Sequence, residues 1–121
     1  MLNDCYFQIK PYEDRLEIVQ VANKHVNKNL TYTFQLKYTK EVRIGRDSYC
    51  EICLNWDKSY SKVQCTFQWD EFMSMWKLTD GNGKNTSRNG TWVFASRSFE
   101  ITDETVFRVA NCKIMINVLQ G

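Results

Sequence analysis

Three short stretches of the sequence carry side chains that suit the binding of an anion. They are Gly45-Arg46, Ser61-Lys62 and the run 87–91, which reads Ser-Arg-Asn-Gly-Thr. Arginine presents a planar fork of donors that matches two phosphate oxygens, while serine, lysine and asparagine add single donors. Glycine lets the backbone approach a ligand closely or adopt positive φ. Gathered on one surface, these groups would bind a phosphate without the means to transform it.

Other residue types argue against catalysis and against a bound metal. His25 is the only histidine, and it lies in a Lys/Asn-rich turn where a solvated side chain is expected. Cys50 and Cys53 have a metal-ligand spacing, but zinc requires four ligands and the chain offers no second cysteine pair or histidine cluster. We therefore expect a binding module with no catalytic residue, no cofactor and no metal.

Length, charge and cysteine content narrow the class of protein. A chain of 121 residues with 43% hydrophobic residues suits one folded domain with a single core. Its net charge of +2 is too small to predict direct nucleic-acid binding, since the basic residues are also spread along the chain. No apolar run approaches the roughly 20 residues of a membrane helix, and no signal peptide is visible. The five cysteines are then expected as reduced thiols in an intracellular protein, nuclear or cytoplasmic.

The elements that must position the candidate residues are expected to be β-strands. Apolar and polar residues alternate over 30–38 and again over 63–69, which is typical of half-buried strands. Turn-rich clusters separate the apolar stretches, and many short strands joined by turns predict a β-sandwich or barrel. The other predicted strands lie at 76–78, 91–94, 104–109 and 113–119.

Two local patterns allow more than one interpretation. Tyr12, Leu16 and Val19 could mark a helix face, but residues 16–21 also suit a strand, and we predict a strand because helix signals are scarce elsewhere. Asn89-Gly90 is a strong hairpin-turn signal with no function attached. Such a turn would also present the asparagine side chain, so we expect both roles together.

The order of these motifs resembles the forkhead-associated (FHA) domain. Each motif alone is common, but several in the right order on alternating strands are specific. The resemblance covers about 16–119, nearly the whole chain. The matching pieces are Gly45-Arg46, Glu51-Ile52-Cys53-Leu54, Ser61-Lys62-x-Gln64-Cys65, Trp76-x-Leu78-x-Asp80 and Ser87-x-Asn89-Gly90-Thr91.

The resemblance implies a fold and a function. The fold would be all-β, a twisted antiparallel β-sandwich of about eleven strands, FHA/SMAD-like. Its loops at one end would bind phosphothreonine in partner proteins, which is one of the recurring modes of peptide recognition. Residues 15–121 would form this domain, and residues 1–14 would be an N-terminal extension or an extra edge strand.

The resemblance also implies which side chains touch the phosphopeptide. Arg46 would contact the phosphate directly, Ser61 would donate its hydroxyl to a phosphate oxygen, and Lys62 would add charge beside it. Asn89 would hold the peptide backbone next to the phosphothreonine. Arg88 stands at a position that varies in the family, and we hypothesise that it supplies a second cation to the phosphate.

Five further residues are expected to shape and brace these loops. The family usually has histidine where this chain has Gln64, and that histidine typically braces the loops; glutamine can still form hydrogen bonds. The loop-shaping residues are Gly45, Gln64, Ser87, Gly90 and Thr91.

Two other functions remain open at this point. The substitution at Gln64 allows a phospho-independent interaction or dimerisation platform of the same fold, which an exposed apolar patch on a sheet face would support. The chain could also be the regulatory part of a larger kinase, phosphatase or ubiquitin-ligase polypeptide.

Overall fold

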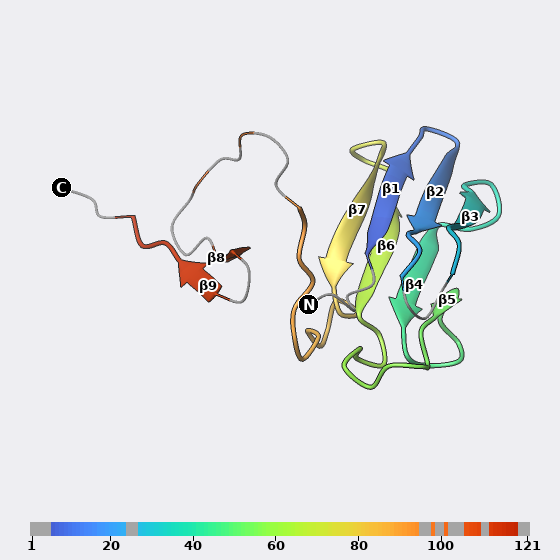
Figure 1. Cartoon of the computed structure of the whole chain (residues 1–121). Coiled ribbons are helices and arrows are strands. Elements are labelled where there is room, and N and C mark those ends of the chain that lie inside the picture. Colours follow the sequence, from blue (N-terminus) through green and yellow to red (C-terminus); the bar gives the residue numbers. More distant parts are fainter. Residues whose placement is uncertain are drawn as a thin grey trace. The chain divides into compact units, whose positions relative to one another are not determined.

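The computed structural model describes residues 6–23, 27–94, 98, 101, 106–109 and 112–118, with only the backbone for 107–109. Within these residues nine strands form three sheets, so the all-β prediction is correct (Figure 1). The described residues contain no helix long and apolar enough to cross a membrane. The part of the chain up to Thr91 and the part Trp92–Gly121 are separate compact units.

The first sheet is antiparallel and has the order β1-β2-β3. Its strands are β1 (Phe7–Pro11), β2 (Arg15–Gln20) and β3 (Leu30–Gln35). The strand prediction for residues 16–21 is therefore confirmed, and the helix alternative is wrong. β2 is paired on both sides, and its inward residues Leu16 and Ile18 are fully buried. β1 lies at the edge of this sheet.

The second sheet has the order β5-β4-β6-β7. Its strands are β4 (Glu41–Gly45), β5 (Ile52–Cys53), β6 (Cys65–Asp70) and β7 (Met75–Asp80). β4 pairs with β5 in parallel, so the expectation of a purely antiparallel sandwich is wrong here. The segment between them contains a turn in which the Cys50 N–H donates to the Asp47 carbonyl. After this segment, β5 runs beside β4 in the same direction.

The core lies between these two sheets, which face each other in Figure 1. Leu16 and Ile18 from β2 pack against buried aliphatic and aromatic side chains of the second sheet and of the segment after β5. Burial of these side chains is the main favourable term in the folding of such a domain. The other members of the core cluster are Val42, Ile44, Ile52, Leu54, Cys65 and Phe67.

Two predicted strands and one predicted turn differ from the observed structure. The alternation at 30–38 continues beyond the end of β3, because the Tyr38 and Thr39 N–H groups donate to the Gln35 carbonyl and form a turn. Residues 91–94 lie in no strand, although their sequence suits one. Alternation alone does not make a strand, since the backbone also needs a pairing partner. The hairpin turn predicted at Asn89-Gly90 has no paired strands on its two sides among the residues that the structure describes.

The unit Trp92–Gly121 contains an antiparallel pair, β8 (Val106–Val109) and β9 (Cys112–Met115). These strands fall within the predicted strands 104–109 and 113–119, apart from Cys112. The described residues thus hold nine strands rather than the expected eleven. Residues 1–5 of the predicted N-terminal extension, including Cys5, lie outside the described residues.

Replacing Leu16 by alanine tests whether the two sheets depend on this core. Leu16 is fully buried at the centre of the sandwich, so Leu16→Ala should lower the free energy of unfolding by about 2–5 kcal/mol. Tyr38→Ala removes a larger side chain that is 79% exposed and should cost less than about 0.5 kcal/mol. Urea denaturation measures both; equal losses would contradict the observed core.

Candidate functional site

The predicted site residues lie at one end of the second sheet. In the strand registers, Ile44 of β4 lies opposite Cys65 of β6, which lies opposite Asp80 of β7. Because these neighbours are antiparallel, the end of β4, the start of β6 and the end of β7 lie together. The loops that leave these strands emerge at the bottom of the sheet in Figure 1. We call residues 46–49, 57–64 and 81–91 the loop end.

Gly45 allows two of these loops to approach each other closely. A Cβ at this position would overlap the Lys62 carbonyl oxygen and lie 2.8 Å from the Val63 Cα. The close approach lets the Arg46 N–H donate to the Ser61 carbonyl at 3.0 Å and the Asp47 N–H donate to the Lys62 carbonyl at 3.1 Å. The glycine therefore places Arg46 directly beside the Ser61-Lys62 pair.

The Arg46 guanidinium is held on one side only. Its side chain is half-buried, and its Nε donates to the Tyr60 carbonyl at 2.9 Å. Its two terminal nitrogens form no hydrogen bond with any described residue. The Tyr60 ring packs edge to face on Trp56, with the ring centroids 5.6 Å apart, and both residues border the core. The guanidinium is thus positioned in advance, with its terminal donors available to an anion.

Three hydrogen bonds join the loop 57–62 to the loop 87–90. The Arg88 N–H donates to Ser61 Oγ at 2.9 Å, and Arg88 Nη2 donates to the Lys58 carbonyl at 2.7 Å. The Asn89 amide donates to the Ser59 carbonyl at 2.9 Å. Because Ser61 Oγ accepts from the backbone, its own hydrogen remains able to donate to another acceptor.

The two basic residues beside this junction have different surroundings. Lys62 is exposed, and its ammonium makes no hydrogen bond or ion pair within the described part of the chain. Arg88 is also exposed, but its guanidinium already donates to the Lys58 carbonyl. The structure thus brings together three segments that are separated in the sequence. They carry Arg46, Ser61 with Lys62, and Arg88 with Asn89.

Gln64 forms the link between the loops. Its Oε1 accepts the Ser61 N–H at 3.1 Å, and its Nε2 donates to the Gly90 carbonyl at 2.8 Å and to Thr91 Oγ1 at 3.3 Å. Gly90 has a φ of 81°, a conformation that glycine adopts far more readily than other residues. One amide side chain therefore connects the loop that bears Ser61 to the loop that bears Asn89.

Asp80, which received no role from the sequence, holds the other side of the loop 87–91. Its Oδ1 accepts the Ser87 hydroxyl at 2.6 Å and the Thr91 hydroxyl at 2.7 Å, and its Oδ2 accepts the Ser87 N–H at 3.0 Å. Burial raises the pKa of this carboxyl, but the hydrogen bonds from Ser87 and Thr91 outweigh burial and hold the pKa below its usual value. The carboxylate therefore stays ionised and fixes the loop. In the sequence, the position of Asp80 at the end of the Trp76-x-Leu78 strand, ahead of Ser87 and Thr91, could have indicated this role.

The cysteines near this site point to different backbone groups. The buried Cys50 thiol donates to the Lys62 carbonyl at 3.3 Å, and the exposed Cys53 thiol donates to the Arg46 carbonyl at 3.6 Å. Burial raises the pKa of Cys50, and it raises the pKa of Cys65 to about 12, so these two thiols stay protonated. The short side chains of Cys50 and Cys53 thus fit against the backbone of the loops that carry Arg46 and Lys62. His25, the only histidine, lies outside the described residues.

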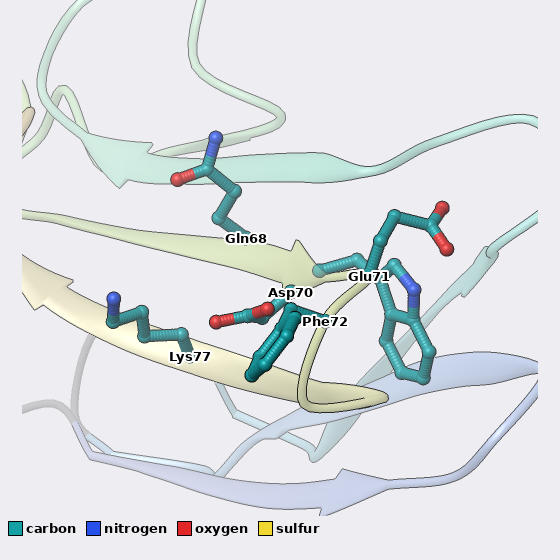
Figure 2. A pocket seen from close by; sticks show the side chains of 6 residues that line it. Gln68, Asp70, Glu71, Phe72 and Lys77 are labelled. Atoms are coloured by element: carbon teal, nitrogen blue, oxygen red, sulfur yellow. The ribbon is translucent and has the colours of Figure 1, made fainter.

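Two hollows lie at the opposite end of the domain. One of about 350 Å³ surrounds the turn between β6 and β7, and another of about 520 Å³ is lined by residues that include Glu13, Lys37 and Glu71. Figure 2 shows the first, with Gln68 and Lys77 on the paired strands and Phe72 beside the turn. The loop end lies at the start of β6 and these hollows lie at its other end, six residues further along the strand. Neither hollow contains the predicted site residues.

Replacing Asp80 by asparagine should loosen the loop end in a pH-dependent way. At pH 7, Asp80→Asn removes an ionised acceptor of three hydrogen bonds and should lower the free energy of unfolding by about 1–3 kcal/mol. The pKa of Asp80 is lower in the folded than in the unfolded chain, where it is about 3.9. The stabilisation by the carboxylate is therefore complete above about pH 4 and is lost as the pH falls through the folded-state pKa.

Urea denaturation at pH 7 and pH 3 measures this difference. The gap in stability between the wild type and Asp80→Asn should shrink at pH 3. Glu13→Gln, at an exposed carboxylate, is the control and should change the stability by less than about 0.5 kcal/mol at either pH. A gap that is the same at both pH values would show that the charge of Asp80 does not hold the loop.

One known protein family matches this sequence. Residues 42–110, more than half of the chain, match the model of the FHA domain. No curated protein and no solved structure matches the chain. FHA domains are generally interaction modules that bind phosphorylated protein partners, and they are not catalytic. The chain belongs to the FHA domain family.

Proposed function

We propose that the loop end binds phosphothreonine in a partner protein. The observation that supports this proposal best is the state of Arg46. Its guanidinium is held through Nε by the Tyr60 carbonyl, while its terminal nitrogens form no hydrogen bond with any described residue. Ser61, directly beside it, retains a hydroxyl hydrogen to donate. Together these groups offer the fork of donors that a phosphate group accepts.

The phosphate would make recognition a switch. A phosphorylated side chain carries a charge of about −1.5 to −2 at pH 7 and three acceptor oxygens. It would gain charge-assisted hydrogen bonds from Arg46 and Ser61, with Lys62 adding positive charge beside it. The unphosphorylated peptide would leave the guanidinium hydrated and gain little. For such a small site we expect a Kd near 1 µM, which corresponds to about −8 kcal/mol.

The remaining residues of the site would position the peptide. Asn89 would exchange or share its bond to the Ser59 carbonyl with the peptide backbone. Arg88, whose guanidinium reaches the Lys58 carbonyl, would turn one of its other nitrogens to the phosphate.

Threonine is the phosphorylated residue that the family resemblance implies. Its branched Cβ also restricts χ1, so that less rotamer freedom is lost on binding than with phosphoserine. We place this reader in the nucleus or cytoplasm.

The exposed turn between β6 and β7 favours a second candidate function, a phospho-independent contact between two copies of the chain. Phe72 is 93% exposed, Met73 55% and Met75 51%. An apolar cluster on a single turn is typical of an interaction surface. This contact would use the end of the sandwich opposite the loop end.

Replacing Arg46 tests the phosphothreonine proposal. Arg46→Ala should weaken binding of a phosphothreonine peptide by about 2–5 kcal/mol, because it removes the fork of donors and leaves the phosphate without its main partner. Arg46→Lys keeps the charge but not the fork and should recover only part of the affinity. Titration calorimetry with a degenerate phosphothreonine peptide pool and its unphosphorylated counterpart measures both variants.

Arg43→Ala is the matched control for these titrations. Arg43 precedes Arg46 by three residues, but its guanidinium is already engaged by Glu51 and by the ring of Tyr49. It should leave phosphopeptide affinity nearly unchanged. Equal affinity of wild type and Arg46→Ala for the phosphorylated pool, or equal affinity for phosphorylated and unphosphorylated pools, would refute the proposed function.

Replacing Phe72 tests the second candidate. Dimerisation through the turn 70–75 predicts that the wild type sediments as a monomer–dimer mixture that shifts with concentration. Phe72→Ser should then remain monomeric, because it removes the most exposed apolar side chain of the cluster. A wild type that stays monomeric up to about millimolar concentration, where even weak contacts are populated, would eliminate this candidate.

A further inference from the structure

The loop end carries an excess of positive charge that a single phosphate does not require. It contains five basic residues and two acidic residues, although the whole chain has a net charge of only +2. The acidic residues are Asp47 and Asp57. The basic residues are Arg46, Lys58, Lys62, Lys84 and Arg88. Positive charge is therefore concentrated on the surface where the proposed phosphate site lies.

These basic residues form no ion pair with a carboxylate that the structure describes. Within the described part of the chain, none of the five lies within 4.0 Å of a carboxylate oxygen. The ion pairs in that part are made elsewhere, by Arg15, Lys40 and Arg43. The carboxylate of Asp80, beneath the loops, accepts hydroxyl and amide donors. The charges at the loop end thus remain available to a ligand.

Three of these basic residues belong to the loops that carry the proposed phosphate site. The Arg88 guanidinium lies against the backbone of Lys58, and the Arg88 N–H lies against Ser61, the neighbour of Lys62. Lys58, Lys62 and Arg88 are all exposed. Arg46 and Ser61 already offer donors to one phosphate, so the exposed charges of Lys58, Lys62 and Arg88 can also meet a bound peptide beside it.

We infer that the preferred partner is a phosphothreonine segment with acidic residues on its flanks. This inference rests on the proposed function and names its ligand class. Lys58 attracts the flanking carboxylates, Lys62 and Arg88 attract both these carboxylates and the phosphate, and Arg46 and Ser61 donate hydrogen bonds to the phosphate. Each exposed pair should strengthen binding about two- to fivefold, so several together should give about tenfold at low salt. Added salt should reduce this preference, because exposed charges are screened.

Four degenerate peptide pools of equal length test the inference. Three have a central phosphothreonine with acidic, neutral or basic flanks, and the fourth is the acidic pool without phosphate. Calorimetric titration of the wild type at low salt should give about tenfold tighter binding of the acidic than of the neutral phosphopeptide pool, and the weakest phosphopeptide binding with basic flanks. At about 0.5 M salt the ratio should fall to about threefold or less.

Two variants with equal loss of charge locate the effect. Lys58→Gln/Lys62→Gln should reduce the ratio of acidic to neutral affinity to about twofold. The ratio cancels any loss of phosphate affinity that both pools suffer. Lys10→Gln/Lys77→Gln removes two exposed lysines from β1 and β7 and should keep the wild-type ratio. All four side chains are exposed, and circular dichroism should verify that both variants fold.

The possible outcomes distinguish failure of the acidic-flank inference from failure of the proposed phosphothreonine binding. Equal wild-type affinity for acidic and neutral phosphopeptides overturns the inference but leaves the phosphothreonine reader intact. An equal fall of the ratio in both double variants also overturns it, since only net charge would matter. Equal binding of the acidic pool with and without phosphate, or no binding of any pool, overturns both.

Discussion

The binding end of this domain depends on one side chain, Gln64, that joins two loops. Its amide accepts the N–H of Ser61 and donates to the Gly90 carbonyl and to Thr91 Oγ1. Loops are costly to order, because each fixed residue loses about 1–2 kcal/mol of backbone entropy. Each hydrogen bond returns about 0.5–1.5 kcal/mol. A glutamine that uses both ends of its amide therefore holds the two loops together, and the ionised Asp80 supports the loop 87–91 from the other side.

The hydrogen bonds of this network organise donors at a surface. They hold Ser61 and the loop 87–91 in place, and the close approach at Gly45 sets Arg46 beside them. The donors are then fixed before any ligand arrives, which lowers the cost of binding. This arrangement suits recognition rather than turnover, in keeping with a family of non-catalytic interaction modules. The excess of basic residues around the same site would extend the proposed recognition surface beyond one phosphate.

Much of the sheet could be predicted because its alternation has a physical cause. In β3 and β6 the residues that face inward are apolar and alternate with polar ones, so the strand prediction follows from burial. β2 alternates in the same way up to Ile18, after which the polar Gln20 is also buried. The segment 91–94 has a similar pattern and forms no strand, because pairing depends on a partner that local sequence does not specify. The parallel β4–β5 pair was missed since it depends on how the turn at Asp47 returns the chain.

The site was predictable in its residue types but not in its bonds. Glycine, arginine, serine and asparagine in the family order identified the loops that converge. The anchors of Arg46 and Arg88, however, are the backbone carbonyls of Tyr60 and Lys58, and any residue offers a carbonyl. The role of Asp80 likewise appears only when Ser87 and Thr91 are folded back onto it.

The most direct test of this account is an NMR titration of the ¹⁵N-labelled chain with a phosphothreonine peptide pool. The account predicts that the largest amide shifts fall on Arg46, Ser61, Lys62, Arg88 and Asn89, and that the unphosphorylated pool leaves these amides unchanged. The largest shifts at the turn 70–75, or the same shifts with and without phosphate, would contradict it.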